Sequence, residues 1–95
     1  MEELEKIATL FYQGFSYDAF QQMEEGTNKI LNIVEMLVEI SSMDTNKYSL
    51  DLNFINAALT EIVNSSENKD GIMVADLLTF EFLDYVGNVL QQWEE

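Results

Sequence analysis

The chain has 95 residues, with 18 aspartates and glutamates against four lysines, and its formal net charge at pH 7 is −14. Binding to nucleic acid or to an anionic membrane requires cations that neutralise phosphates, so this composition disfavours direct contact with either. Histidine and cysteine are absent, which excludes the usual nucleophile–base pairs and the metal sites built on imidazole or thiolate, and we expect neither catalysis nor a cofactor.

Helical periodicity dominates the chain, which contains no proline and only four glycines. The first helix is predicted over residues 2–13, because Leu4, Ile7 and Phe11 recur at the three- and four-residue spacing of one helix face. Gly14 follows as a residue that can adopt the positive φ angle common just beyond helix ends. The length of the chain predicts a single domain over all of its residues.

A second, longer helix is predicted over residues 17–41, with Ser16 as its N-cap. Gly26 lies inside this helix, where glycine costs up to ~1 kcal/mol relative to alanine. We therefore expect Gly26 to mark a close contact with another helix.

The second half of this helix is apolar around most of its circumference. Within residues 30–40 the only polar residues are Asn32, Glu35 and Glu39, and these share one narrow strip. A helix of this kind touches neighbours on two or three sides or lies at a contact between subunits.

Residues 42–49 are predicted to form the main loop, and Ser49 is expected to cap a third helix over residues 50–66. The spacing of its apolar residues predicts one buried stripe. This stripe consists of Leu52, Ile55, Leu59 and Ile62.

The fourth helix is predicted over residues 71–93. Asp70 and Gly71 form a turn signal, and Asp70 is expected to cap the helix. Asp76 interrupts the apolar run that follows, and we expect it to project away from the core. The predicted buried stripe is Val74, Ala75, Leu78, Phe82, Tyr85, Val86, Val89 and Trp93.

Four helices with short connections predict an all-α, up-and-down four-helix bundle with two long and two shorter helices. The second and fourth helices would span ~35 Å and the other two ~18–25 Å. The unmatched apolar length of the longer pair predicts a homodimer or a groove for a partner. The residues expected at this contact are Ile33, Met36, Leu37, Ile40 and Phe80.

Glu81 borders the apolar stripe of the fourth helix, with Leu78 three residues before it and Tyr85 four residues after it. Two interpretations remain open. A partly buried carboxylate can be a functional group. Alternatively, Glu81 is an edge residue whose carboxylate accepts a hydrogen bond from Tyr85 or contacts water.

Residues 10–27 are similar to the turn and second helix of a tetratricopeptide repeat. The matching positions are Gly14, Ala19, Met23 and Gly26. The unit does not recur, whereas repeat folds need about three copies, so we interpret it as a helical hairpin.

The sequence also resembles small acidic helical proteins of Gram-positive bacteria. The features that carry this resemblance are the segments Tyr12–Gly14, Asn68–Asp70 and Ala75–Leu78, followed by Glu81 and Trp93. Gly71 departs from the larger residue expected there. The resemblance implies a flagellum-linked role, and no functional residues are carried over from it.

We expect a non-enzymatic protein-binding or adaptor module, chaperone-like in holding an amphipathic or basic segment of a partner. The alternative is an acidic nucleic-acid mimic that occupies the basic site of a DNA- or RNA-binding protein. Mimicry requires acids in rows on one face, whereas an adaptor requires an exposed apolar groove. An acidic N-terminal stretch lacks the basic region of a signal peptide, so we expect a cytoplasmic protein.

Overall fold

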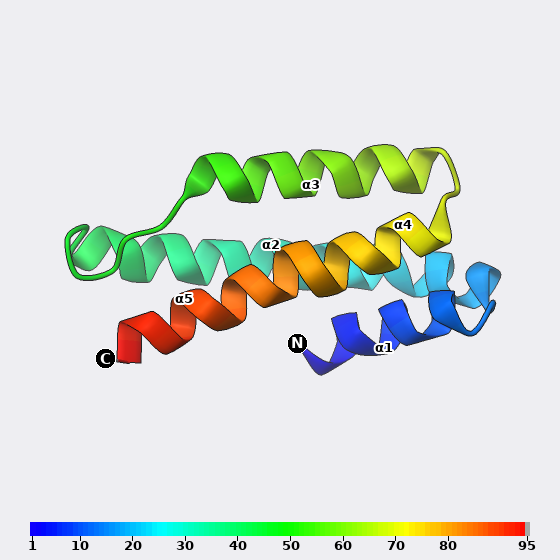
Figure 1. Cartoon of the computed structure of the whole chain (residues 1–95), viewed down its shortest axis with the longest axis horizontal. Helices are drawn as coiled ribbons and strands as arrows, with labels where there is room; N and C mark the ends of the chain where they lie inside the picture. The colour runs from blue at the N-terminus through cyan, green and yellow to red at the C-terminus, as the bar shows by residue number, and fades with distance from the viewer. Residues whose placement is uncertain (95) are drawn as a thin grey trace.

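The structure, a computed structural model, describes residues 1–94 and is all-α (Figure 1). Its elements are α1 (Glu2–Tyr12), α2 (Ser16–Met43), α3 (Leu52–Glu67), α4 (Gly71–Asp76), η1 (Leu77–Leu83) and α5 (Asp84–Glu94). The last three elements are continuous and form one long fourth helix. The all-α, four-helix prediction is therefore confirmed.

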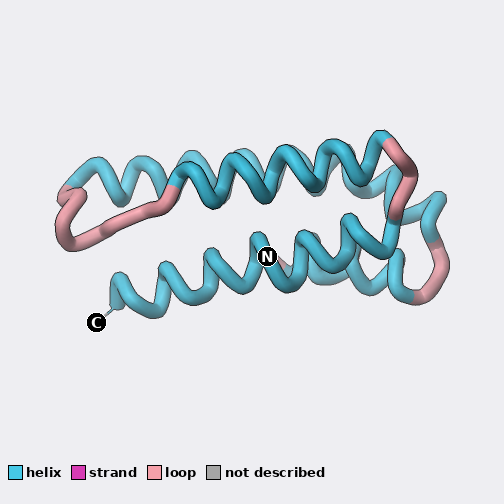
Figure 2. Tube along the Cα trace, turned by 45° about the horizontal axis from the view of Figure 1, so that its top comes forward, coloured by secondary structure: helices cyan, strands magenta, loops and turns pink. Residues whose placement is uncertain are grey.

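The four helices run up and down in an elongated bundle of 42 × 21 × 19 Å (Figures 1 and 2). α1 packs against α2, α4 and η1, while α3 packs against α4 and η1. α2 and the fourth helix run in the same direction, and α1 and α3 run opposite to them (Figure 1). Among residues 1–94, no helix combines the length and apolar character needed to cross a bilayer.

The core is built from apolar side chains of all four helices, and no polar or charged side chain is buried within residues 1–94. Its largest fully buried side chains are Phe11, Phe82, Leu4, Leu37, Ile55, Leu78, Val74 and Val86. Leu52, predicted to be buried, is half-exposed. It is the first residue of α3, so its side chain lies at the end of the core.

Two glycines allow α1 to approach its neighbours closely. A Cβ atom added at Gly26 of α2 would lie 2.7 Å from Ile7 Cδ1, which confirms the close helix contact expected there. A Cβ added at Gly71 would lie 2.6 Å from Cδ1 of the Phe11 ring. Both distances are too short for a real carbon–carbon contact, so a larger residue would displace the Ile7 or the Phe11 side chain.

The helix ends follow the sequence signals in part. Gly14 has a φ angle of +86° beyond the end of α1, as predicted. The Asp70 carboxylate accepts a hydrogen bond from Met73 N at 3.1 Å, which confirms it as a cap. Ser49 was the wrong cap for α3, because Asp51 accepts from Phe54 N instead. The prediction that Ser16 caps the second helix is also wrong, since α2 begins at that residue and has no side-chain cap.

The fourth helix contains a π-helical segment, η1, which the sequence did not predict. A π-helical segment is wider than an α-helix and changes the faces on which the following residues lie. Leu77 is buried in η1 together with the predicted Leu78 and Phe82.

Asp76 stays outside the core, as predicted, but it is half-buried and faces a neighbouring helix. Its carboxylate accepts a hydrogen bond from the Tyr12 hydroxyl at the end of α1. This bond ties α1 to the fourth helix at the point where η1 begins.

Two aromatic side chains of α5 fasten the loop between α2 and α3. The Tyr85 hydroxyl accepts a hydrogen bond from Asp51 N at 2.8 Å. The Trp93 indole Nε1 donates to the Ser49 carbonyl at 3.2 Å, and its ring packs edge-on against Tyr48. These contacts explain why Tyr85 and Trp93, predicted to be buried, are only partly buried at the rim of the core.

Candidate functional site

The helix lengths leave part of α2 uncovered within residues 1–94. α1 has 11 residues and α2 has 28, which correspond to ~16 Å and ~42 Å. The contact between Gly26 and Ile7 fixes where the two helices meet. Because α1 runs antiparallel to α2, its first residue lies beside the middle of α2, and the remaining turns of α2 extend beyond it (Figure 1).

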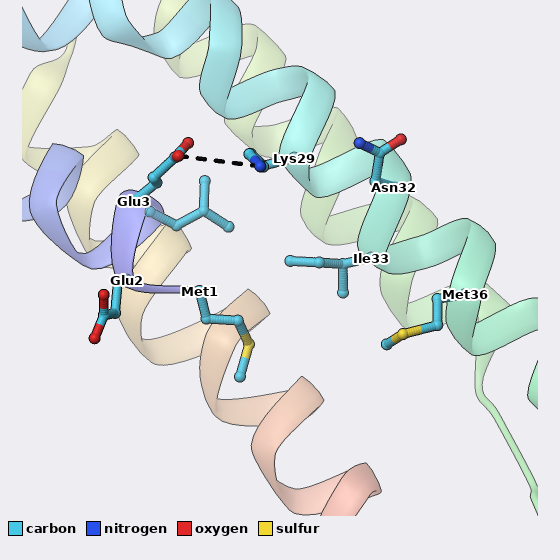
Figure 3. A pocket seen from close by; sticks show the side chains of 8 residues that line it. Met1, Glu2, Glu3, Lys29, Asn32, Ile33 and Met36 are labelled. Atoms are coloured by element: carbon cyan, nitrogen blue, oxygen red, sulfur yellow. Dashed lines mark ion pairs between the residues drawn. The ribbon is translucent and has the colours of Figure 1, made fainter.

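A hollow of about 550 Å³ lies at this point, between the first turn of α1 and one side of α2. Figure 3 shows Met1, Ile33 and Met36 around it, with Lys29 and Glu3 at its edge. The lining side chains are Met1, Glu2, Glu3, Leu4, Lys29, Asn32, Ile33 and Met36. It is therefore a recess of mixed character, in which four apolar side chains lie beside four polar or charged ones.

The apolar side of this hollow continues along α2 towards its C-terminal end. The spacing of Ile33, Met36, Ile40 and Met43 places them on one side of the helix, and we call these four residues the groove flank. Ile33 and Ile40 are half-buried, whereas Met36 is 44% exposed and Met43 is 76% exposed. Methionine side chains adapt to irregular partner surfaces, so this flank suits contact with another helix.

The charges around the groove flank are mostly negative. Lys29 lies 4.0 Å from Glu3, and both side chains are more than half exposed, so this ion pair contributes little to stability. Glu39 lies one helical turn from Met36 and is exposed, as are Asp44 and Glu94 at the ends of α2 and α5. A partner helix would therefore need an apolar stripe with basic residues beside it.

The structure brings together three of the five predicted contact residues, namely Ile33, Met36 and Ile40. Leu37 is fully buried in the chain's own core, so its assignment to a contact surface is corrected. Phe80 lies on η1, is 68% exposed and does not line the hollow. The helical period puts Leu37 about 100° around α2 from Met36, which explains why a continuous apolar run divides into core and surface.

Glu81 is exposed on η1 and has no side-chain hydrogen bond within the described residues 1–94. Its geometry agrees with the interpretation that it is an edge residue whose carboxylate contacts water. It lies outside the hollow and holds no position in the candidate site.

The sequence did not reveal the α1 side of the hollow, formed by Met1, Glu3 and Leu4. The relevant signal was the length difference between the first two helices, read together with Gly26 as the point where they cross. The sequence also did not divide α2 into two sides. Leu31 (54% exposed) and Val38 lie on the side of α2 away from the groove flank, and they serve below as a comparison surface.

A family model described as "Domain of unknown function (DUF8042)" matches residues 1–94 of the chain. No curated protein matches the chain. No solved structure matches it either.

Proposed function

The chain belongs to the DUF8042 family, and we propose that it is a non-enzymatic protein-binding module whose groove flank takes an amphipathic helix of a partner protein. The observation that carries this proposal is the row of partly exposed apolar side chains on α2 beside the hollow at the start of α1. A helix placed there would fill the position that α1 fills along the first half of α2.

The charge of the chain defines the chemistry of the partner. With a net charge of −14 and exposed acids beside the groove flank, the chain attracts a segment that carries lysine or arginine. Burial of Met36, Met43 and the exposed parts of Ile33 and Ile40 supplies the apolar contribution, at ~1.5–3 kcal/mol for each fully buried side chain. This contribution offsets only part of the cost of association, and attraction between the acids of the chain and the basic residues of the partner supplies the rest. The flagellum-linked role remains a prediction of the resemblance alone.

A designed peptide tests this proposal. The probe is a fluorescent helix of about 14 residues (~21 Å), with leucines on one face and lysines on the other. Fluorescence anisotropy measures its affinity for the wild-type chain, for Met36→Glu and for Leu31→Glu. The two variants add the same charge to the same helix at two comparably exposed residues, on different sides of α2.

Met36→Glu is expected to weaken binding by about tenfold or more, because an apolar contact worth at least ~1.4 kcal/mol is lost. Leu31→Glu is expected to change it by less than about twofold. Circular dichroism melts confirm that both variants fold. If the two variants bind alike and salt abolishes binding, the peptide contacts the acidic surface as a whole. That result would refute the groove and favour the nucleic-acid mimic.

The predicted homodimer would use the same groove flank. Two copies that each carry −14 repel one another, so we propose that the dimer forms only at high ionic strength and that the peptide displaces it. Sedimentation equilibrium in about 300 mM sodium chloride is expected to show a dimer for the wild type and a monomer for Met36→Glu. If both proteins are monomers, the dimer is refuted and the groove flank binds only the partner helix. If both are dimers, the chain self-associates through a surface other than the groove flank.

A further inference from the structure

We propose, on the basis of the function proposed above, that the bound helix has a defined direction: it lies in line with α1 and antiparallel to both α2 and α5. Its C-terminal end would face the start of α1, and its N-terminal end would lie beside the ends of α2 and α5. The occupant is a helical segment of a partner with an apolar stripe and basic edges.

The first argument is the charge at one end of the molecule. α2 and α5 run in the same direction and end at the same end of the bundle (Figure 1). Unpaired carbonyls give each helix C-terminus a partial negative charge. Asp44 and Glu94 add carboxylates there, and Lys47 is a cation of this end, with Nζ 5.2 Å from the Tyr48 ring centre. The balance remains negative and favours the positive N-terminal end of a bound helix.

The charge is different at the other end of the groove flank, where the hollow lies beside the start of α1. Lys29 lines it, and the N-terminal N–H groups of α1 carry a partial positive charge. Glu2 and Glu3 line it as well and offset part of this charge. This end is therefore less negative than the end at Met43, and it favours the negative C-terminal end of the bound helix.

The second argument comes from Gly87 of α5. Nothing lies within 4 Å of a Cβ atom added there, and its φ angle is not positive, so nothing within residues 1–94 requires a glycine. Glycine inside a helix is less stable than alanine. Leu83, four residues earlier on the same face, lines a hollow together with Ala8 and Tyr12 of α1. A helix in line with α1 would pass Gly87 as α1 passes Leu83, and a glycine there permits close approach.

Paramagnetic labelling measures the direction. The chain contains no cysteine, so one introduced cysteine carries one nitroxide. Asn28→Cys places it near Lys29, and Gln91→Cys places it near the end of α5; both positions are exposed and neither lines the hollow. The probe is the leucine–lysine peptide, with isotopic labels in its first and last turns. The label at residue 91 is expected to broaden the resonances of the peptide's first turn. The label at residue 28 is expected to broaden those of its last turn.

Each outcome has a distinct meaning. The reverse pattern, or equal broadening of both turns from each label, would overturn the direction; the proposed function would stand if Met36→Glu still weakens binding. Absence of binding would overturn both. In addition, Gly87→Leu is expected to weaken binding about tenfold, whereas Asn88→Leu, one residue further around the helix, is expected to leave it unchanged. Equal effects would refute the close approach at Gly87.

Discussion

Two helical glycines have opposite surroundings, which predicts opposite effects of the same substitution. Gly87→Ala should raise the free energy of unfolding by ~0.5–1 kcal/mol, because the added methyl group meets nothing and alanine favours the helix. Gly71→Ala should lower it by ~1–3 kcal/mol, because the added Cβ would lie 2.6 Å from the buried Phe11 ring. Urea unfolding of both variants measures the two changes. If the free energy of unfolding changes in the same direction in both variants, the packing of α1 differs from the one described.

The hydrogen bond between Tyr12 and Asp76 predicts a pH dependence. Donation to the Asp76 carboxylate, with smaller contributions from burial and from the negative charge, raises the pKa of the Tyr12 hydroxyl above its ordinary value of 10.0. Folding therefore favours the protonated phenol. Its contribution to stability is fully present below pH ~10 and is lost as the pH rises through the raised pKa.

The variant Tyr12→Phe isolates this effect. The wild type should melt at a higher temperature than Tyr12→Phe at pH ~8, and the difference should shrink or reverse by pH ~11. Thermal melts of both proteins across this range provide the measurement. A difference that stays constant through pH ~11 would mean that Tyr12 does not donate to a carboxylate.

At the scale of the helix, the caps of α3 and of the fourth helix predict which aspartates matter. Asp51→Ala and Asp70→Ala should each lower the free energy of unfolding by about 1 kcal/mol, because each removes the acceptor of a first-turn N–H group. Ser49→Ala is the control and should change it by less than ~0.5 kcal/mol. Denaturant melts of the three variants check this, and a larger loss for Ser49→Ala would indicate that the α3 cap is misassigned.

The extents of the helices could be predicted from sequence, because residues such as Leu4, Ile7 and Phe11 repeat at helical spacing and Gly14 and Asp70 mark ends with specific backbone needs. The choice between Ser49 and Asp51 as a cap could not, since both residues can cap and tertiary contacts of Tyr85 and Trp93 position the loop. The π-helical segment also left no local signal, because the apolar residues of this segment fit the spacing of an ordinary α-helix.

The residues of the candidate site could be predicted only in part, because tertiary packing also decides which side chains are exposed. The apolar excess of α2 is a property of composition, so Ile33, Met36 and Ile40 could be identified from the sequence. Which of their neighbours face inward depends on the angle at which α2 meets the bundle. Leu37 lies between them in sequence and is nevertheless a core residue.

The charge of the whole molecule predicts a dependence on salt. Within residues 1–94 a single ion pair is seen, between Lys29 and Glu3, so most of the 18 acids repel one another without compensation. The melting temperature should rise between about 10 and 300 mM sodium chloride, because salt shortens the screening length to below ~10 Å. A flat or falling curve would indicate that the acids are paired or hold a bound cation.

The central claim is that one side of α2, beside the start of α1, is a docking surface for a helix. The most direct measurement is the change in backbone amide resonances of the ¹⁵N-labelled wild-type chain on titration with the leucine–lysine peptide. The largest changes should occur at residues 1–4, at residues 29–40 and at Gly87. Changes concentrated on α3, or spread evenly over the acidic residues of all four helices, would contradict the claim.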